Sequence, residues 1–130
     1  MKKRSRSKSI LTPAIIFLIF WLGAVVHSEI LTFKHGHEFE TAFYEAQLYN
    51  AIGHLGHLKI LRYSDTTARV YFVSINRYGG ISGSEIGDRL GGHVFVFSND
   101  DGQWVVREQE RLVWSRTGSA RNGFVWPHIR

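Results

Sequence analysis

The stretch EFETAFYEAQLYNAIGHL, residues 38–55, decides the fold, because its apolar residues recur at steps of three and four. The recurring residues are Phe39, Ala42, Phe43, Ala46 and Tyr49, with Ile52 or Gly53 continuing the series. This spacing places them on one face of an α-helix, and most of the polar residues fall on the other. Glutamates in the first turn suit the helix dipole, and the glycines at 53 and 56 suit its end. We therefore predict one amphipathic helix over about residues 37–54.

Four segments after this helix alternate with a period of two, which is typical of β-strands. They are HLKILRY (57–63), ARVYFVSI (68–75), HVFVFS (93–98) and QWVVREQERLVWS (103–115), and GFVWPHI (123–129) is a candidate for a short final strand. YSDTT (63–67) and SNDDGQ (98–103) predict tight turns, the second because Asp-Gly accepts positive φ. The long helix can bury its apolar face only against one face of a sheet. We predict an α+β fold in which this helix packs on a curved antiparallel sheet of about four strands.

This order of elements, over residues 37–115, resembles the NTF2-like and cystatin-like cone folds. NTF2-like domains have two further helices before the sheet, and the chain has no room for them, so a reduced or cystatin-like version fits better. Families of this shape include extracytoplasmic domains behind a single membrane helix, among them assembly subunits of secretion systems, as well as small enzymes. The resemblance rests on no diagnostic motif, so it implies a fold and not a function.

Residues 1–33 have the pattern of a membrane-inserting segment. Five basic residues among the first nine precede an uncharged run from Ile10 to Val26. Such a run is near the minimum length for a helix that spans a bilayer. By the positive-inside bias, we expect a single-pass cell-membrane protein whose domain, residues 34–130, lies outside the cytoplasm. The alternative is cleavage near Ser28, between Ser28 and Glu29, which would secrete the domain.

The remaining charges balance. Five of the 16 basic residues lie in the first nine, so residues 10–130 carry 11 basic and 11 acidic side chains. Polyanion binding needs clustered Lys and Arg, so we expect no nucleic-acid partner. The chain has no cysteine, which excludes disulfides, thiolate zinc sites and cysteine nucleophiles. We expect no cofactor.

Two histidine pairs are weak candidates for metal ligands. They are His35 with His37, and His54 with His57. The pairs lie on opposite sides of the predicted helix, so about seventeen residues at 1.5 Å each would separate them by roughly 25 Å. Because a zinc site needs three or four converging ligands, we expect exposed imidazoles at the two ends of a helix. On this interpretation the segment from Ile52 to Leu58 ends the helix.

The strand 103–115 holds a conflict between two tryptophans and two carboxylates. Simple alternation puts Glu108 and Glu110 on the same face as Trp104 and Trp114, and unpaired carboxylates on a buried face are costly. One solution is a β-bulge near 107–109 or a solvated sheet edge, which turns the charges outward. The other is a polar pocket with a raised-pKa carboxylate, to which His93 could contribute.

Two further segments are candidate partner surfaces. The connection 76–92 is rich in glycine, lacks the pattern of a phosphate-binding loop, and contains Ile81, Ile86 and Leu90, which would be costly to expose fully. It is either a binding loop or an ordinary flexible hairpin. Phe124 and Trp126, near the C-terminus, either dock on the sheet or contact another protein.

These observations favour a membrane-anchored or secreted extracytoplasmic module for binding or assembly. Its expected partners are the membrane, through residues 10–26, and another protein, with a second copy of the chain as one candidate. The rival is a small NTF2-like enzyme or ligand-binding cup that uses Glu108, Glu110 or His93. The rival needs an inward-facing carboxylate with a perturbed pKa, whereas the module needs an exposed apolar surface. A metal-carrying protein is a third hypothesis, and it depends on the histidine pairs alone.

Overall fold

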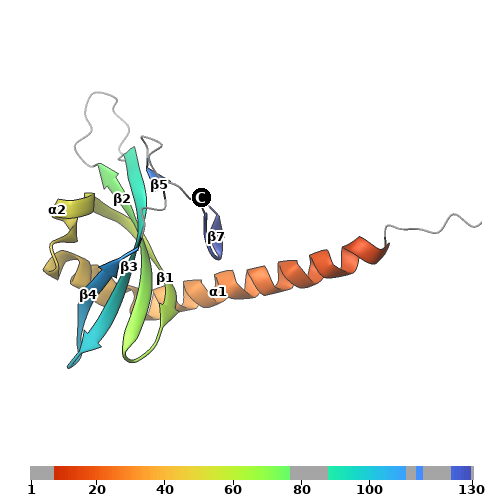
Figure 1. The fold of residues 1–130 in the computed structure, drawn as a ribbon, viewed down its shortest axis with the longest axis horizontal. Helices are drawn as coiled ribbons and strands as arrows, with labels where there is room; N and C mark the ends of the chain where they lie inside the picture. Colours follow the sequence, from red (N-terminus) through yellow and green to blue (C-terminus); the bar gives the residue numbers. More distant parts are fainter. Residues whose placement is uncertain (1–7, 77–87, 111–113, 116–123, 130) are drawn as a thin grey trace, which may run out of the picture.

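The protein has one long N-terminal helix and an antiparallel sheet, so the predicted α+β class is confirmed (Figure 1). The structure, a computed structural model, describes residues 8–76, 88–110, 114–115 and 124–129. Its elements are α1 (Lys8–Glu45), α2 (Leu48–Ile52), β1 (His54–Tyr63), β2 (Thr67–Asn76), β3 (Asp88–Asp100), β4 (Gln103–Gln109), β5 (Trp114–Ser115), β6 (Phe124–Val125) and β7 (His128–Ile129). The main sheet has the order β1-β2-β3-β4, and β5 also pairs with β3. β6 and β7 form a separate hairpin.

The helix α1 joins two segments that the sequence predicted as separate elements. It runs without a break from the apolar N-terminal run into the amphipathic stretch, because no proline and only one glycine, Gly36, lies between Val26 and Glu45. The predicted helix over 37–54 is therefore wrong at both ends. α1 stops at Glu45, and Gln47, with a φ of 54°, starts the short helix α2 in a different direction.

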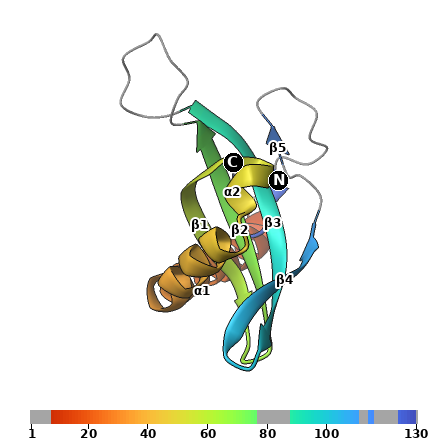
Figure 2. The same ribbon diagram turned by 90° about the vertical axis from the view of Figure 1, so that its left-hand side faces the viewer.

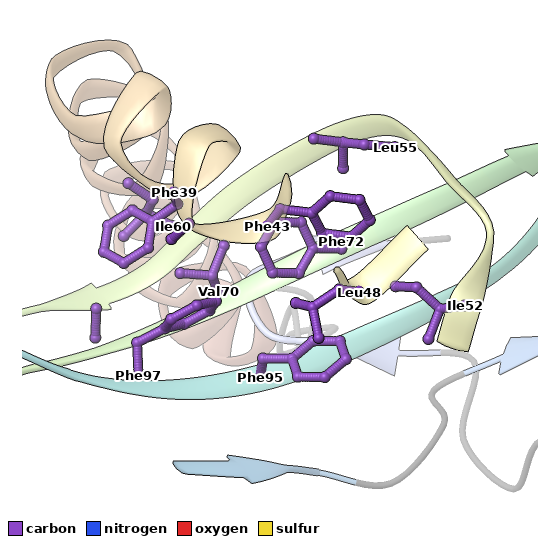
Figure 3. Close-up of a cluster of buried hydrophobic side chains, with 12 residues drawn as sticks. Phe39, Phe43, Leu48, Ile52, Leu55, Ile60, Val70, Phe72, Phe95 and Phe97 are labelled. Carbon is purple, nitrogen blue, oxygen red and sulfur yellow. The ribbon is translucent and has the colours of Figure 1, made fainter. Parts of the chain in front are cut away.

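The main core lies between the sheet and the C-terminal part of α1 (Figure 3). Phe39 of α1 packs against Phe97, with ring centroids 5.3 Å apart. Phe43 of α1 packs against Phe72, with ring centroids 5.1 Å apart. α2 closes one end of this layer with two buried aliphatic residues. We call this side of the sheet the inner face; Figure 2 views it with α1 and α2 in front of the strands.

The opposite side of the sheet, the outer face, has a smaller apolar cluster. Tyr71, Val73 and Val94 pack there with Val125 of the β6–β7 hairpin. The N-terminal half of α1 projects on this side, away from α2, and the hairpin lies beside it (Figure 1). The inner face is therefore covered by α1 and α2, whereas the C-terminal hairpin covers only the part of the outer face around Tyr71, Val73 and Val94.

Both predicted turns are confirmed. Asp101 and Gly102, with φ of 53° and 87°, connect β3 and β4, and the Gly102 N–H donates a 2.8 Å hydrogen bond to Asn99 Oδ1. Positive φ at both central residues is the requirement of the tightest hairpin turns. Between β1 and β2, the Ser64 N–H donates to the carbonyl of Thr67 at 2.8 Å.

The helix α1 also covers the edge strand β1. Thr32 Oγ1 accepts the Ile60 N–H at 2.9 Å, and Ser28 Oγ donates to the Ile60 carbonyl at 2.7 Å. Beside them Lys59 forms an ion pair with Glu29. Backbone groups at a sheet edge are otherwise open to pairing with another strand, so the two hydroxyls fasten α1 to β1 and close this part of the edge.

Candidate functional site

A β-bulge in β4 decides the orientation of Glu108. β3 pairs Phe97 with Val106 but Val96 with Glu108, so Arg107 is an extra residue in β4. Of the two solutions that the sequence left open for this strand, the bulge is the one observed. It places Glu108 opposite Val96 on the outer face, where the side chain is exposed.

The other carboxylate, Glu110, forms a two-pronged ion pair with Arg69. Arg69 donates from Nε to Glu110 Oε1 at 2.7 Å and from Nη2 to Oε2 at 2.6 Å. The hydrogen bond from Arg69 lowers the pKa of Glu110 below its ordinary value, and the same bond raises the pKa of Arg69. The ligand-cup hypothesis requires a carboxyl with a raised pKa, and Glu110 is shifted in the opposite direction.

His93, the third pocket candidate, does lie on the inner face. It is opposite Phe72 in the β2–β3 ladder and is 9% exposed. Its Nε2 is 3.5 Å from Ser74 Oγ, which itself donates to the Gly91 carbonyl at 3.2 Å. Nδ1 is buried and has no hydrogen-bond partner within the described part of the chain. Burial lowers the pKa of His93, so this imidazole is neutral at pH 7 and keeps one nitrogen available for a hydrogen bond.

A pocket of about 240 Å³ lies at the other end of β2. Its lining residues are Arg62, Thr67, Ala68, Arg69 and Val96. Neither His93 nor a carboxylate lines it, and Arg69 is already paired with Glu110. The three sequence-predicted pocket residues are thus not brought together.

The histidine pairs occupy other elements than predicted. His35 and His37 are inside α1, where His35 Nδ1 lies 2.9 Å from Glu38 Oε1 and its ring stacks on Tyr63 with centroids 3.9 Å apart. His54 and His57 belong to β1, so the prediction that 52–58 ends a helix holds only as far as Gly53. Among the described residues, no group of three or more His, Asp or Glu is placed to hold a metal ion.

Glu38 connects this region of α1 to β4. It accepts a 3.0 Å hydrogen bond from Trp104 Nε1 in addition to the contact with His35. Burial alone would raise the pKa of Glu38, but the hydrogen bonds from His35 and Trp104 outweigh it, and the pKa is lowered. These contacts hold α1 on the sheet.

The candidate partner residues are placed in part. Trp126 is at the turn of the β6–β7 hairpin and is 45% exposed. Leu90 belongs to β3 and Phe124 to β6, with side chains outside the description. Ile81 and Ile86 lie outside the described residues.

The sequence analysis missed an exposed apolar strip on α1 beyond the predicted membrane segment. Ile30 is 48% exposed and Phe33 is 93% exposed. Val26, Ile30 and Phe33 follow the i, i+4, i+7 spacing of one helix face. This spacing predicts an apolar strip only if the two predicted segments form one continuous helix. The contacts from Trp21, Ser28 and Thr32 to distant parts of the chain were also missed.

Comparison of the chain with known protein families, with curated proteins and with solved structures gives no match.

Proposed function

We propose that the chain is a membrane-anchored module for binding or assembly, with its small α+β domain held at the membrane surface outside the cytoplasm. The observation that carries this proposal is the continuity of α1. Between Leu11 and Val26 it exposes nine large apolar side chains, each 48–72% exposed, whereas Phe39 and Phe43 are fully buried in the core. By length and composition this helix can cross a membrane. One helix of 38 residues, about 57 Å long, thus serves both as anchor and as part of the domain.

The contacts of the apolar segment support a retained anchor over a cleaved signal. Ser28 is 2% exposed and binds the Ile60 carbonyl, and Trp21 Nε1 donates to the Pro127 carbonyl at 2.8 Å. Cleavage between Ser28 and Glu29 would remove both contacts and would leave part of the β1 edge uncovered.

The proposed orientation depends on the basic residues before the apolar run, which favour a cytoplasmic N-terminus. The natural chain has no cysteine, so a single cysteine reports on one position. Asp101→Cys, in the exposed β3–β4 turn, should react in intact cells with a maleimide that cannot cross membranes. A reaction only after the cells are broken would show that the domain lies in the cytoplasm and would contradict the proposed orientation.

Exposed apolar surface supports a binding module over a ligand cup. Ile30 and Phe33 lie on α1 just past the membrane segment, where a neighbouring protein would meet them. The cup hypothesis required an inward carboxylate, and Glu108 and Glu110 are directed to the outer face or paired with Arg69. His93 alone remains in the position that a cup would need.

Photo-crosslinking in cells tests the binding function. A photoreactive amino acid at position 33 should give a discrete adduct with another protein or with a second copy of the chain. The matched control is position 40, an exposed glutamate of the same helix. No adduct from position 33, or the same adducts from both positions, would contradict a binding role for this strip.

A further inference from the structure

The C-terminal hairpin is docked on the membrane segment of its own chain. The carbonyl of Pro127, in the β6–β7 turn, accepts the Trp21 indole N–H, and the rings of Trp126 and Phe17 have centroids 6.2 Å apart. On its other side the hairpin is held by the sheet, because Val125 is buried against the outer-face cluster. The hairpin therefore lies between the sheet and the apolar half of α1 (Figure 1).

The two helix contacts lie inside the apolar run. Trp21 is five residues before Val26 and Phe17 is nine residues before it. At 1.5 Å per residue, these residues lie about 8 Å and about 14 Å along the axis from the end of the run. The hydrocarbon core is about 30 Å thick. If the run fills that core, the turn of the hairpin lies below its surface, in the half nearer to the domain.

The chemistry of this turn suits lipid. A backbone that enters the hydrocarbon must satisfy its polar groups within the protein. Pro127 has no N–H to satisfy, and its carbonyl is already bound by Trp21. On either side of the turn, β6 and β7 pair Val125 with His128 and Phe124 with Ile129. Few backbone groups of the turn are left to desolvate.

The side chains of the hairpin also suit contact with lipid. Trp126 is 45% exposed, and its indole is a large, mostly apolar group. The segment 124–129 contains no acidic residue and no Lys or Arg. A segment without these charged residues costs less to transfer into lipid.

We propose that the β6–β7 hairpin is a second membrane contact, which inserts the exposed side chain of Trp126 beside α1 into the lipid leaflet that faces the domain. The inference rests on the proposed function, because it requires α1 to be in the bilayer. The insertion fixes the outer face of the sheet toward the membrane and leaves the inner face, with α2, directed away from it.

Spin labels on single cysteines test this in the full-length protein, reconstituted in phosphatidylcholine vesicles. Trp126→Cys is compared with Phe20→Cys on the exposed apolar side of α1 and with Asp101→Cys in the β3–β4 turn. Oxygen concentrates in lipid, whereas a water-soluble nickel complex is excluded from it. The label at 126 should be accessible to oxygen and protected from nickel, as at position 20; position 101 should show the reverse.

The outcomes separate this inference from the proposed function. Nickel accessibility at 126 equal to that at 101 would overturn the insertion while position 20 still reports a membrane helix. Low accessibility to both reagents would mean burial in protein and would also overturn it. Nickel accessibility at position 20 would instead contradict the membrane anchor itself.

A second measurement does not depend on folding of Trp126→Cys. In vesicles with brominated acyl chains, the quenched fraction of tryptophan fluorescence should be smaller for Trp126→Phe than for the natural chain, since one lipid-exposed indole is lost. An equal or larger quenched fraction in Trp126→Phe would contradict the insertion.

Discussion

Two glycines, Gly36 in α1 and Gly56 in β1, have opposite steric surroundings. A Cβ at Gly56, in the β1 irregularity, would lie 2.6 Å from Ile75 Cγ2 and 3.1 Å from the Val73 carbonyl, whereas a Cβ at Gly36 of α1 would find only contacts of 3.7 Å or more. We predict that Gly56→Ala lowers the free energy of unfolding by about 1–3 kcal/mol through overpacking. Gly36→Ala should raise it by about 0.5–1 kcal/mol, because alanine favours the helix. Urea unfolding in detergent micelles measures both, and equal effects would contradict the packing.

His93 should make stability depend on pH. Burial lowers its pKa in the folded state, so below the unfolded value of about 6.5 the unfolded chain binds the proton more readily and stability falls as the pH decreases. His93→Gln and His93→Phe remove this titration. We predict that each substitution costs less unfolding free energy at pH 5.5 than at pH 8. A cost that is constant with pH, or larger at low pH, would show that His93 is not the destabilised imidazole.

The ion pair of Glu110 with Arg69 should also make stability decrease at low pH. Glu110 has a lowered pKa because of Arg69, so its stabilising effect is present above the unfolded pKa of about 4.3 and is lost as the pH falls through the lower folded pKa. Both partners are about one third exposed or more. We therefore expect Glu110→Gln to cost no more than about 1 kcal/mol at pH 7. Glu108→Gln, on an exposed side chain, should be neutral; a larger loss for Glu108→Gln would contradict the bulge.

At the scale of elements, the α1–β1 contact depends on two hydroxyls. Ser28→Ala and Thr32→Val each leave one backbone group of Ile60 without its partner. An unsatisfied buried group costs about 1–3 kcal/mol, so we predict losses of that size in unfolding free energy. Thr41→Val is the control, because Thr41 Oγ1 bonds only within its own helix, to the His37 carbonyl, at an exposed position. A loss for Thr41→Val as large as for Thr32→Val would show that β1 is not involved.

The strands and turns were predictable from the sequence because their signals are local. Alternation identified β1 to β4, and Asp101-Gly102 identified the β3–β4 turn. The conflict between tryptophans and carboxylates in β4 left a bulge or solvated edge and a polar pocket as alternatives, and the register of β3 with β4 shows the bulge. The helix boundaries were not predictable in the same way. No helix-breaking residue separates the apolar run from the amphipathic stretch. The left-handed backbone conformation at Gln47 is adopted by a residue that is neither glycine nor asparagine, so the sequence contains no signal for it.

At the scale of the whole molecule, the positions of the candidate residues depend on contacts between distant parts of the chain, which local sequence patterns do not predict. Trp21 and Pro127 are 106 positions apart, and Arg69 and Glu110 are 41 apart. The composition showed that segments near both ends of the chain are apolar. It did not predict that the C-terminal segment docks on the N-terminal helix. In the resulting molecule, the domain is built onto the helix that is apolar enough to cross a membrane: α1 supplies core residues to the inner face, and the C-terminal hairpin contacts the same helix on the outer side.

The mass of the protein in the membrane fraction of expressing cells tests this account most directly. We predict the full-length chain of 14.9 kDa, retained in membranes after washing at alkaline pH, because removing residues 1–28 would take away Trp21, Ser28 and their contacts. A soluble product that begins at Glu29 and is still folded would contradict the account, since it would show that the domain neither keeps nor needs its anchor.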